Sequence, residues 1–350
     1  PVLRGDEVVL LDGTGAYRFN ARTGEPIADP IKRPRDLNRT GRSNGACTGS
    51  RATVNWLMAN AWLFVGPDGK PHINQAARSA CGQGLVPANG LVFATPTPCD
   101  CGDYLRGYLA MAPRVFGEAI ADELRLTSFD ALEVNVSAAE QESNSQDWPI
   151  FLGNPHRTSA TDAKLPGTLK KLWSVQATPA PQGSLDADRR HSERYLGALS
   201  APVVAYGVAL VSAPETHQIL AFDSQNGRRL WAIPPAAKVD SPPTIVGGLA
   251  VFGCNDGSVN AVRVSDGASV WRFAAAPTTG RSMLHGHLAS THPVPGRVLI
   301  LGETVIAIAG QHTDLGGLHV WALDLATGRK KAHRILSLIH ISEPTRPQCI

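Results

Sequence analysis

Apolar and polar residues alternate with a period of two along much of the chain, in short runs separated by turns rich in glycine, proline, asparagine and aspartate. This alternation predicts β-strands that bury one face. In the clearest window, residues 221–231, a strand leads into Asn226-Gly227, a pair that tolerates the positive φ of a tight turn, and a second strand follows. A helical solenoid needs a period near 3.6, and the pattern therefore excludes it.

The same window recurs along the chain. Residues 221–231 return about 40 residues later as 261–271, a third copy spans 322–329, and a fourth begins at Tyr17. In the second copy Arg263 replaces the aspartate, and the third lacks the tryptophan, which we attribute to the chain running into a different C-terminal sequence. The shared positions are Ala221, Asp223, Gly227 and Trp231, then Ala261, Gly267 and Trp271, then Ala322, Asp324 and Gly328.

Two further strands precede each of the first two copies, at 200–211 and 241–252. One period therefore holds four short strands, which cannot bury both faces alone and is typical of a propeller blade. We predict an all-β fold, a β-propeller of four-stranded blades. The tryptophan after the glycine turn is expected to pack between neighbouring blades.

The pattern Ala-x-Asp-x-x-x-Gly-x-x-x-Trp resembles the repeat of pyrroloquinoline-quinone (PQQ) type β-propellers, a superfamily that includes quinoprotein alcohol dehydrogenases and an outer-membrane assembly scaffold lipoprotein. Residues 86–91, 147–151 and 239–243 are also similar to a bacterial, planctomycete-like subfamily of PQQ-repeat proteins. The resemblance implies seven or eight blades in the intact protein, eight being favoured by the tryptophan pattern. About six are represented here, and we expect a fragment truncated at both ends.

Four regions are expected along the chain. Residues 1–115 form N-terminal blades with cysteine-containing insertions, 116–147 a linker or insertion with a short helix near 118–126, and 148–335 the PQQ-like repeats. Residues 336–350 resemble a translated sequencing adapter and are left out of the fold prediction.

Composition narrows the function classes. Lys and Arg number 33 against 30 Asp and Glu, a net charge of +3, which does not favour a nucleic-acid partner. The sequence holds no apolar run long enough to span a membrane. Phosphate-binding loops, dinucleotide fingerprints and nucleophile elbows do not occur.

Cysteines and histidines supply weak candidates for chemistry. Cys47, Cys81, Cys99 and Cys101 fit no common zinc spacing, and one or two disulfides in an exported protein explain them better. His285, His287 and His292 could bind a metal ion, but no carboxylate lies nearby in the sequence, and a polar loop is the interpretation we favour.

Two aspartates are the weak catalytic candidates. Asp240 stands at the entrance of a blade strand and Asp314 beside two glycines, and in a quinone enzyme either could be a general base or a calcium ligand. A structural role is the interpretation we favour for both: Asp240 would tie one loop to the next by side-chain hydrogen bonds, and Asp314 would sit in a tight turn.

Two functions therefore remain open. The first is a non-catalytic propeller, exported to the periplasm or cell envelope, that binds a protein partner or small ligand on its face. The second, implied by the resemblance, is a PQQ- and calcium-dependent dehydrogenase of alcohols or sugars.

Overall fold

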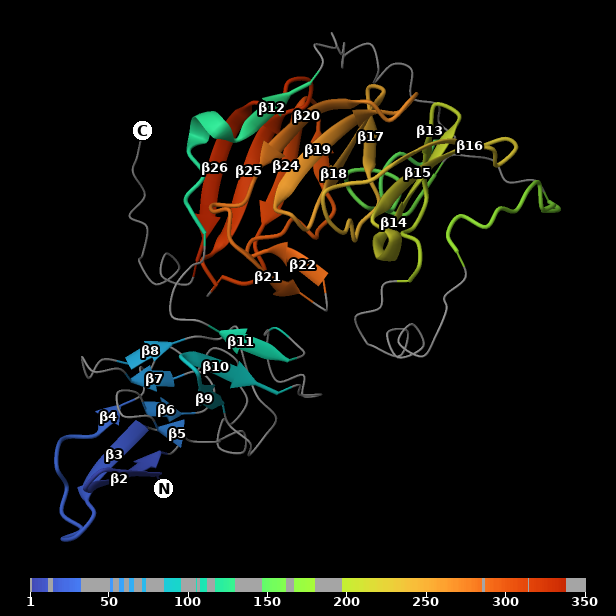
Figure 1. Ribbon diagram of the computed structural model, residues 1–350. Helices are drawn as coiled ribbons and strands as arrows, with labels where there is room; N and C mark the ends of the chain where they lie inside the picture. The colour runs from blue at the N-terminus through green and yellow to red at the C-terminus, as the bar shows by residue number, and fades with distance from the viewer. Residues whose placement is uncertain are drawn as a thin grey trace. The chain divides into compact units, whose positions relative to one another are not determined.

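The structure is a computed structural model whose regular elements are almost all β-strands (Figure 1). It divides into an N-terminal unit, Pro1–Val115 with His312–Gly316, and a C-terminal unit, Phe116–Gln311 with Gly317–Ile350. The structure describes residues 2–11, 15–32, 51–52, 57–59, 63–65, 71–73, 85–95, 105, 108–111, 117–129, 147–161, 167–179, 197–284, 287–313 and 315–337.

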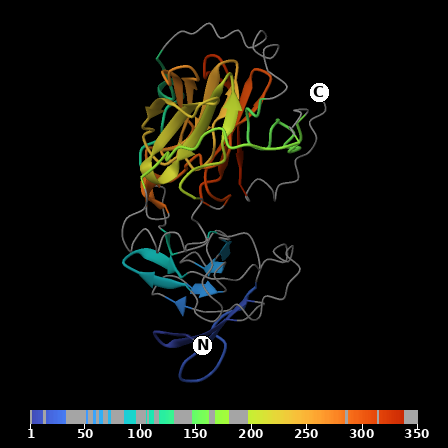
Figure 2. The ribbon, with the colours of Figure 1, turned by 90° about the vertical axis from the view of Figure 1, so that its right-hand side faces the viewer.

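Three consecutive antiparallel sheets of four main strands form the body of the C-terminal unit, and their strands pair in chain order (Figure 1). Figure 2 shows the same sheets from the side, in yellow, orange and red. They are blade 1 with β13 (Val203–Ala205), β14 (Val208–Ala213), β15 (Gln218–Asp223) and β16 (Arg229–Ile233); blade 2 with β17 (Thr244–Val246), β18 (Leu249–Gly253), β19 (Ser258–Arg263) and β20 (Ser269–Ala274); and blade 3 with β23 (Leu299–Leu301), β24 (Thr304–Ala309), β25 (Leu318–Asp324) and β26 (Lys330–Leu336).

The blades pack side by side through their first strands, because β13 contacts β17 and β17 contacts β23. One apolar cluster joins blades 1 and 2 and includes Leu210, Ile219 and Phe252, which are almost fully buried. A second cluster joins blades 2 and 3 around Trp271 and Trp321. These features confirm the predicted β-propeller of four-stranded blades.

Each repeat tryptophan joins its own blade to the next one. The indole Nε1 of Trp231 in blade 1 donates to Val264 O in blade 2 at 2.8 Å, and that of Trp271 in blade 2 donates to Leu325 O in blade 3 at 2.9 Å. Both rings lie over the turn glycine of the next blade: a Cβ on Gly267 would come within 2.8 Å of the Trp231 ring. The tryptophans therefore pack between blades.

Trp173 makes the same contact one blade earlier, although it lies outside the motif. Its Nε1 donates to Ser224 O at 3.0 Å, and its ring lies over Gly227, where a Cβ would approach it to 2.6 Å. The segment 167–179 thus carries the tryptophan that docks onto blade 1.

The third repeat copy corrects one expectation. Its missing tryptophan is not explained by the C-terminal sequence, because β26 continues to Leu336 and pairs along its length with β25. Ala332 pairs with Ala322 at the register position where Trp271 pairs with Ala261 in blade 2. Alanine therefore replaces tryptophan within an otherwise complete blade.

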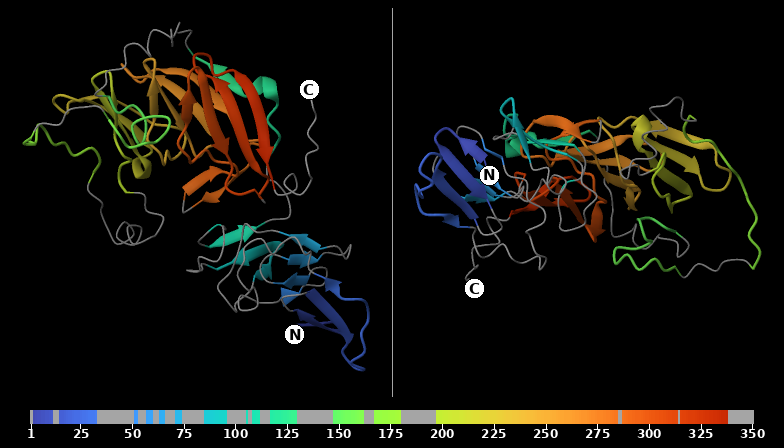
Figure 3. Two further views of the ribbon diagram at one scale, coloured as in Figure 1. Left: turned by 180° about the vertical axis from the view of Figure 1, so that it is seen from behind. Right: turned by 90° about the horizontal axis from the view of Figure 1, so that it is seen from below.

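A strap formed by residues 117–129 closes the outer edge of blade 2. It contains a 3-10 turn, η2 (Asp122–Leu124), in place of the short helix expected at 118–126, followed by strand β12 (Leu126–Ser128). β12 pairs antiparallel with β20, so blade 2 has five strands (Figures 1 and 3). This part of the region that the sequence marks as a linker or insertion is thus integrated into the sheet.

Arg125 fixes the strap. Its guanidinium donates to the carbonyls of Ala274, Ala276 and Ile120, each at 2.8 Å, and to Asp122 Oδ1 at 2.9 Å. The residue is only 8% exposed, and the charge lies 5.0 Å from the ring centre of Trp321. One side chain therefore satisfies carbonyls from both the strap and the end of β20.

A hairpin of β21 (Arg281–Leu284) and β22 (His287–Ser290) lies between blades 2 and 3 in the chain.

The described residues of the N-terminal unit form three smaller sheets. The fourth motif copy forms a turn like the others, with Gly24 N donating to Asn20 O at 2.9 Å. The strands are β1 (Val2–Arg4), β2 (Glu7–Leu11), β3 (Gly15–Asn20) and β4 (Ile31–Lys32); β5 (Arg51–Ala52), β6 (Leu57–Ala59), β7 (Leu63–Val65) and β8 (Pro71–Ile73); and β9 (Val86–Ala88), β10 (Leu91–Ala94) and β11 (Leu109–Met111).

Candidate binding face

Three connections of blades 1 and 2 meet at one end of the propeller. They are the β14–β15 turn, the chain between β16 and β17, and the β18–β19 turn. In an antiparallel meander the second turn and the exit of the fourth strand lie at the same end of the sheet, and neighbouring blades repeat this arrangement. Polar side chains from the three connections therefore converge there.

The centre of this polar cluster is Lys238. Its Nζ lies 3.1 Å from Glu215 Oε1 and 3.4 Å from Asp240 Oδ1. Asn255 Nδ2 donates to Asp240 Oδ2 at 2.8 Å, and the Asn255 backbone N donates to Lys238 O at 2.9 Å. The cluster is mostly shielded, since the side chains of Lys238 and Asp240 are 11% and 15% exposed. Shielded charges of this kind require partners, and here they provide them for one another.

Hydroxyl groups extend the same connection from blade to blade. Ser212 Oγ in blade 1 donates to Ser241 O, and Ser241 Oγ in turn donates to Gly296 O before blade 3. Thr244 Oγ1 donates to Val298 O at 2.7 Å. Asp240 therefore stands in a segment that is hydrogen-bonded to both neighbouring blades.

The histidine candidates lie in two different surroundings. His287 Nε2 is 3.6 Å from Glu215 Oε2 at the edge of the polar cluster, and its ring is 5.7 Å from that of His217. His292 is buried and packs edge-on against His319, with 5.4 Å between the ring centres. Within the described ranges no three histidine, cysteine, aspartate or glutamate side chains are grouped so that they could hold a metal ion.

His319 belongs to a stacked group of aromatic rings. Its Nδ1 lies 3.1 Å from His333 Nε2, and the His333 ring stacks on Trp321 with 3.6 Å between centres. His333 is exposed at the surface of β26, but the partial burial of its ring, with the nearby charge of His319, lowers its pKa below the ordinary value of 6.5. The fold therefore favours the neutral His333 ring.

This shift predicts an acid-sensitive step in stability. The stabilisation by neutral His333 is present above about pH 6.5 and is lost as the pH falls through the lower folded-state pKa. His333→Gln should therefore flatten the decline of the unfolding free energy below about pH 6.5. Urea unfolding at several pH values measures this, with His156→Gln, at an exposed histidine, as the control. Equal slopes in the His333 variant and the wild type would contradict the assignment.

Cys254 and Asp256 lie in the β18–β19 turn beside Asn255. Burial raises the pKa of the Cys254 thiol to about 12, so the group is a packed neutral side chain. Burial would also raise the pKa of Asp256, but hydrogen bonds from Ser258 and Arg272 outweigh it and lower the value.

The remaining predicted site residues lie outside the described ranges. They are Cys47, Cys81, Cys99, Cys101, His285 and Asp314.

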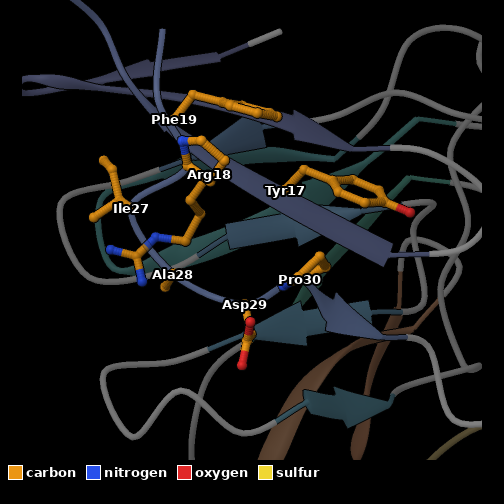
Figure 4. Close-up of a pocket in the computed structure, with 8 residues that line it drawn as sticks. Tyr17, Arg18, Phe19, Ile27, Ala28, Asp29 and Pro30 are labelled. Atoms are coloured by element: carbon orange, nitrogen blue, oxygen red, sulfur yellow. The ribbon is translucent and has the colours of Figure 1, made fainter. Parts of the chain in front are cut away.

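Two hollows lie away from the polar cluster. One of about 540 Å³ lies along the β3–β4 hairpin (Figure 4). Its Arg18 is already paired with Glu7 at 2.7 Å. The other, about 170 Å³, lies where residues 147–155 cross the inner hairpin turns of the three blades. Trp148 N in that segment donates to Val204 O, and Ile245 N donates to Pro149 O. The described residues of both hollows therefore form mainly structural contacts.

Comparison with known proteins places the fold in a family. The pattern of the PQQ_2 family, described as outer membrane protein assembly factor BamB, matches residues 168–347, just over half of the chain. The chain belongs to the PQQ_2 family. The match covers blades 1 to 3 and the Trp173 segment, and it extends into the segment 336–350. No curated protein matches the chain.

Solved structures similar to this PQQ-type propeller include a BamB protein and alcohol dehydrogenases. BamB from Moraxella catarrhalis is 23% identical over 38% of this chain and 34% of its own, with a TM-score of 0.29. Quinohemoprotein alcohol dehydrogenase ADHIIG from Pseudomonas putida HK5 is 16% identical over 59% and 28%, with a TM-score of 0.39. The enzyme from Comamonas testosteroni is 18% identical over 58% and 29%, with a TM-score of 0.37. The aligned part of this chain spans about a third or less of each of these proteins.

No helix among the described residues is long and apolar enough to cross a membrane.

Proposed function

We propose that this PQQ-type propeller is a non-catalytic binding or scaffold module of the cell envelope. Its binding face is the end that carries the polar cluster of Glu215, Lys238, Asp240 and Asn255, and it takes a protein partner or a small ligand. The observation that carries the proposal is the mutual pairing of these groups. The charged side chains at this end already neutralise one another and are held by connections from two blades. They therefore lose little conformational freedom when a partner binds, which favours binding.

A PQQ- and calcium-dependent dehydrogenase is the second candidate, and one observation favours it. Glu215, Asp240 and Asn255 are oxygen-bearing side chains of the types that calcium prefers, gathered at one end of a quinoprotein-type propeller. Against it, the ammonium of Lys238 lies within 3.4 Å of both carboxylates, where it competes with a metal ion. The cluster as it stands therefore does not fit calcium.

A quinone titration separates the two candidates. Wild-type protein is titrated with PQQ, with calcium or with a chelator, while tryptophan fluorescence is followed. We expect no saturable, calcium-dependent quenching up to tens of micromolar quinone. Stoichiometric binding that needs calcium, together with alcohol oxidation through an artificial electron acceptor, would replace the scaffold proposal with the dehydrogenase.

The binding face has its own test. A photo-crosslinking residue at Thr216, exposed beside Glu215, is compared in envelope extracts with one at Asn226, exposed at a turn at the other end of blade 1. We expect saturable adducts from position 216 only. Equal adducts from both positions would show that this end is not the binding face.

A further inference from the structure

Lys238 and its neighbours form an unusual arrangement for a loop lysine. The chain between β16 and β17 brings its ammonium between carboxylates from two different connections, at 3.1 Å from Glu215 and 3.4 Å from Asp240. The residue is only 9% exposed. Removing a lysine ammonium from water costs free energy, and here two carboxylates flank the charge and offset that cost.

Asn255 adds an independent observation. The residue is 4% exposed, and its amide Nδ2 is used by Asp240. Its Oδ1 is buried and has no hydrogen-bond partner within the part of the chain that the structure describes. A buried carbonyl oxygen without a donor is costly, and it leaves an acceptor on a residue that contacts the cluster through its other amide atom.

We propose that the Lys238 ammonium occupies a cation position between Glu215 and Asp240, beside Asn255, and that a neutral residue at position 238 opens a calcium site there. Two carboxylates and an amide oxygen, completed by water, are a ligand set that Ca²⁺ accepts. Ca²⁺ would neutralise both carboxylates, where Lys238 neutralises one charge. Magnesium is disfavoured because it demands a nearly ideal octahedron, which loop side chains from two blades do not supply.

This inference goes beyond the proposed function, because it concerns the cation position and makes no use of quinone or partner. The two can fail separately. The quinone titration uses the wild type, whereas the cation test uses a Lys238 variant without any quinone. The inference also identifies Lys238 as the residue that keeps this face from binding a metal ion.

The test is calcium binding by Lys238→Met, which keeps the apolar stem and removes the charge. Calorimetry and thermal melting are performed with CaCl₂ and with MgCl₂. We expect one calcium site, at least about tenfold tighter than any wild-type binding, and a calcium-dependent rise in Tm. Magnesium should have little effect. Adding Asp240→Asn to the variant should abolish the site.

Lys331→Met is the matched control. Lys331 Nζ lies 3.1 Å from Asp324 Oδ2, the same distance as in the Lys238–Glu215 pair, but its side chain is 38% exposed. This variant should gain no calcium binding. A gain equal to that of Lys238→Met would mean that any lost ion pair suffices, and would overturn the proposal.

The remaining outcomes also decide the question. Folded Lys238→Met that binds no calcium, or wild type that binds it equally well, overturns the proposal. If the variant does not fold in chelator, it is refolded with and without CaCl₂, alongside the milder Lys238→Gln. Calcium-dependent recovery of folded protein supports the cation position, and absence of recovery and of binding in both variants refutes it.

Discussion

Replacing Trp271 with alanine should lower the free energy of unfolding by about 3–5 kcal/mol, the range for truncating a large buried aromatic side chain. Trp271 is 1% exposed, and its indole N–H satisfies the carbonyl of Leu325 in the next blade. The variant loses packing between blades 2 and 3 and leaves that carbonyl without its donor. Urea unfolding, followed by circular dichroism, measures the loss.

A phenylalanine variant separates the two contributions. Trp271→Phe keeps most of the apolar contact and removes the N–H, so we expect roughly half of the alanine effect or less. If Trp271→Ala were within about 0.5 kcal/mol of wild type, the tryptophan contact could not be joining the blades as described.

The glycine beneath the ring offers a matched comparison. A Cβ on Gly328, at φ +70°, would lie 2.6 Å from the Trp271 ring, whereas one on Gly248, at φ +73°, meets nothing within 4 Å. Both alanine variants carry the backbone strain of a positive φ, about 1 kcal/mol. Only Gly328→Ala should also displace the indole. Its excess over Gly248→Ala therefore measures the docking contact.

Arg125→Met should cost about 3 kcal/mol and release the strap from blade 2. Three backbone carbonyls and Asp122 lose a charged donor, and Trp321 loses the cation over its ring. Thermal unfolding gives the size of the effect. Hydrogen exchange localises it, because the amides of β12 should lose their protection before those of β18 and β19.

Arg125→Lys and Arg263→Met are the controls for this prediction. Lysine keeps the charge but cannot reach several carbonyls at once, so an intermediate loss is expected. Arg263 pairs with Asp266 on the surface, and its replacement should change stability by less than about 1 kcal/mol. Unchanged protection of β12 in Arg125→Met would show that strand pairing alone holds the strap.

The repeat could be predicted from the sequence because the residues that define it lie close together in the chain. Ala221, Gly227 and Trp231 recur at fixed spacing, and each residue type has a local reason: a small residue opposite the ring, a turn with positive φ, and an indole that docks. The bulge after the motif alanine occurs in all three blades, between Ala221/Phe222, Ala261/Val262 and Ala322/Leu323. Sequence periodicity therefore defines the blade and its internal register.

Other features carried no local signal. Trp173 lacks the glycine four residues before it that marks Trp231, so its docking became visible only in three dimensions. β12 is three residues long and pairs with β20, which lies far along the chain. No periodicity within residues 117–129 predicts this pairing. A 3-10 turn and an arginine anchor replaced the predicted helix.

The polar cluster could be predicted from the sequence only in part. Glu215 and Asn255 are separated by one repeat length and occupy the same kind of turn in successive blades, so superposing the repeats could have paired them. Lys238 and Asp240 come from the connection between blades, which varies in length and escapes such an alignment. The sequence drew attention to Asp240, but not to the lysine beside it.

The strap also has a consequence for biosynthesis. Arg125 and Ala274 are 149 residues apart in the chain, and at about 5–20 residues per second the ribosome needs roughly 7–30 seconds to supply that partner. During this interval the strap has been synthesised, but β20, the strand with which β12 pairs, has not. Its charged residues Asp122, Glu123 and Arg125 suit this delay, because they oppose premature pairing with other chains. The strap is thus synthesised before the other strands of blade 2, but it can join the sheet only after they have been made.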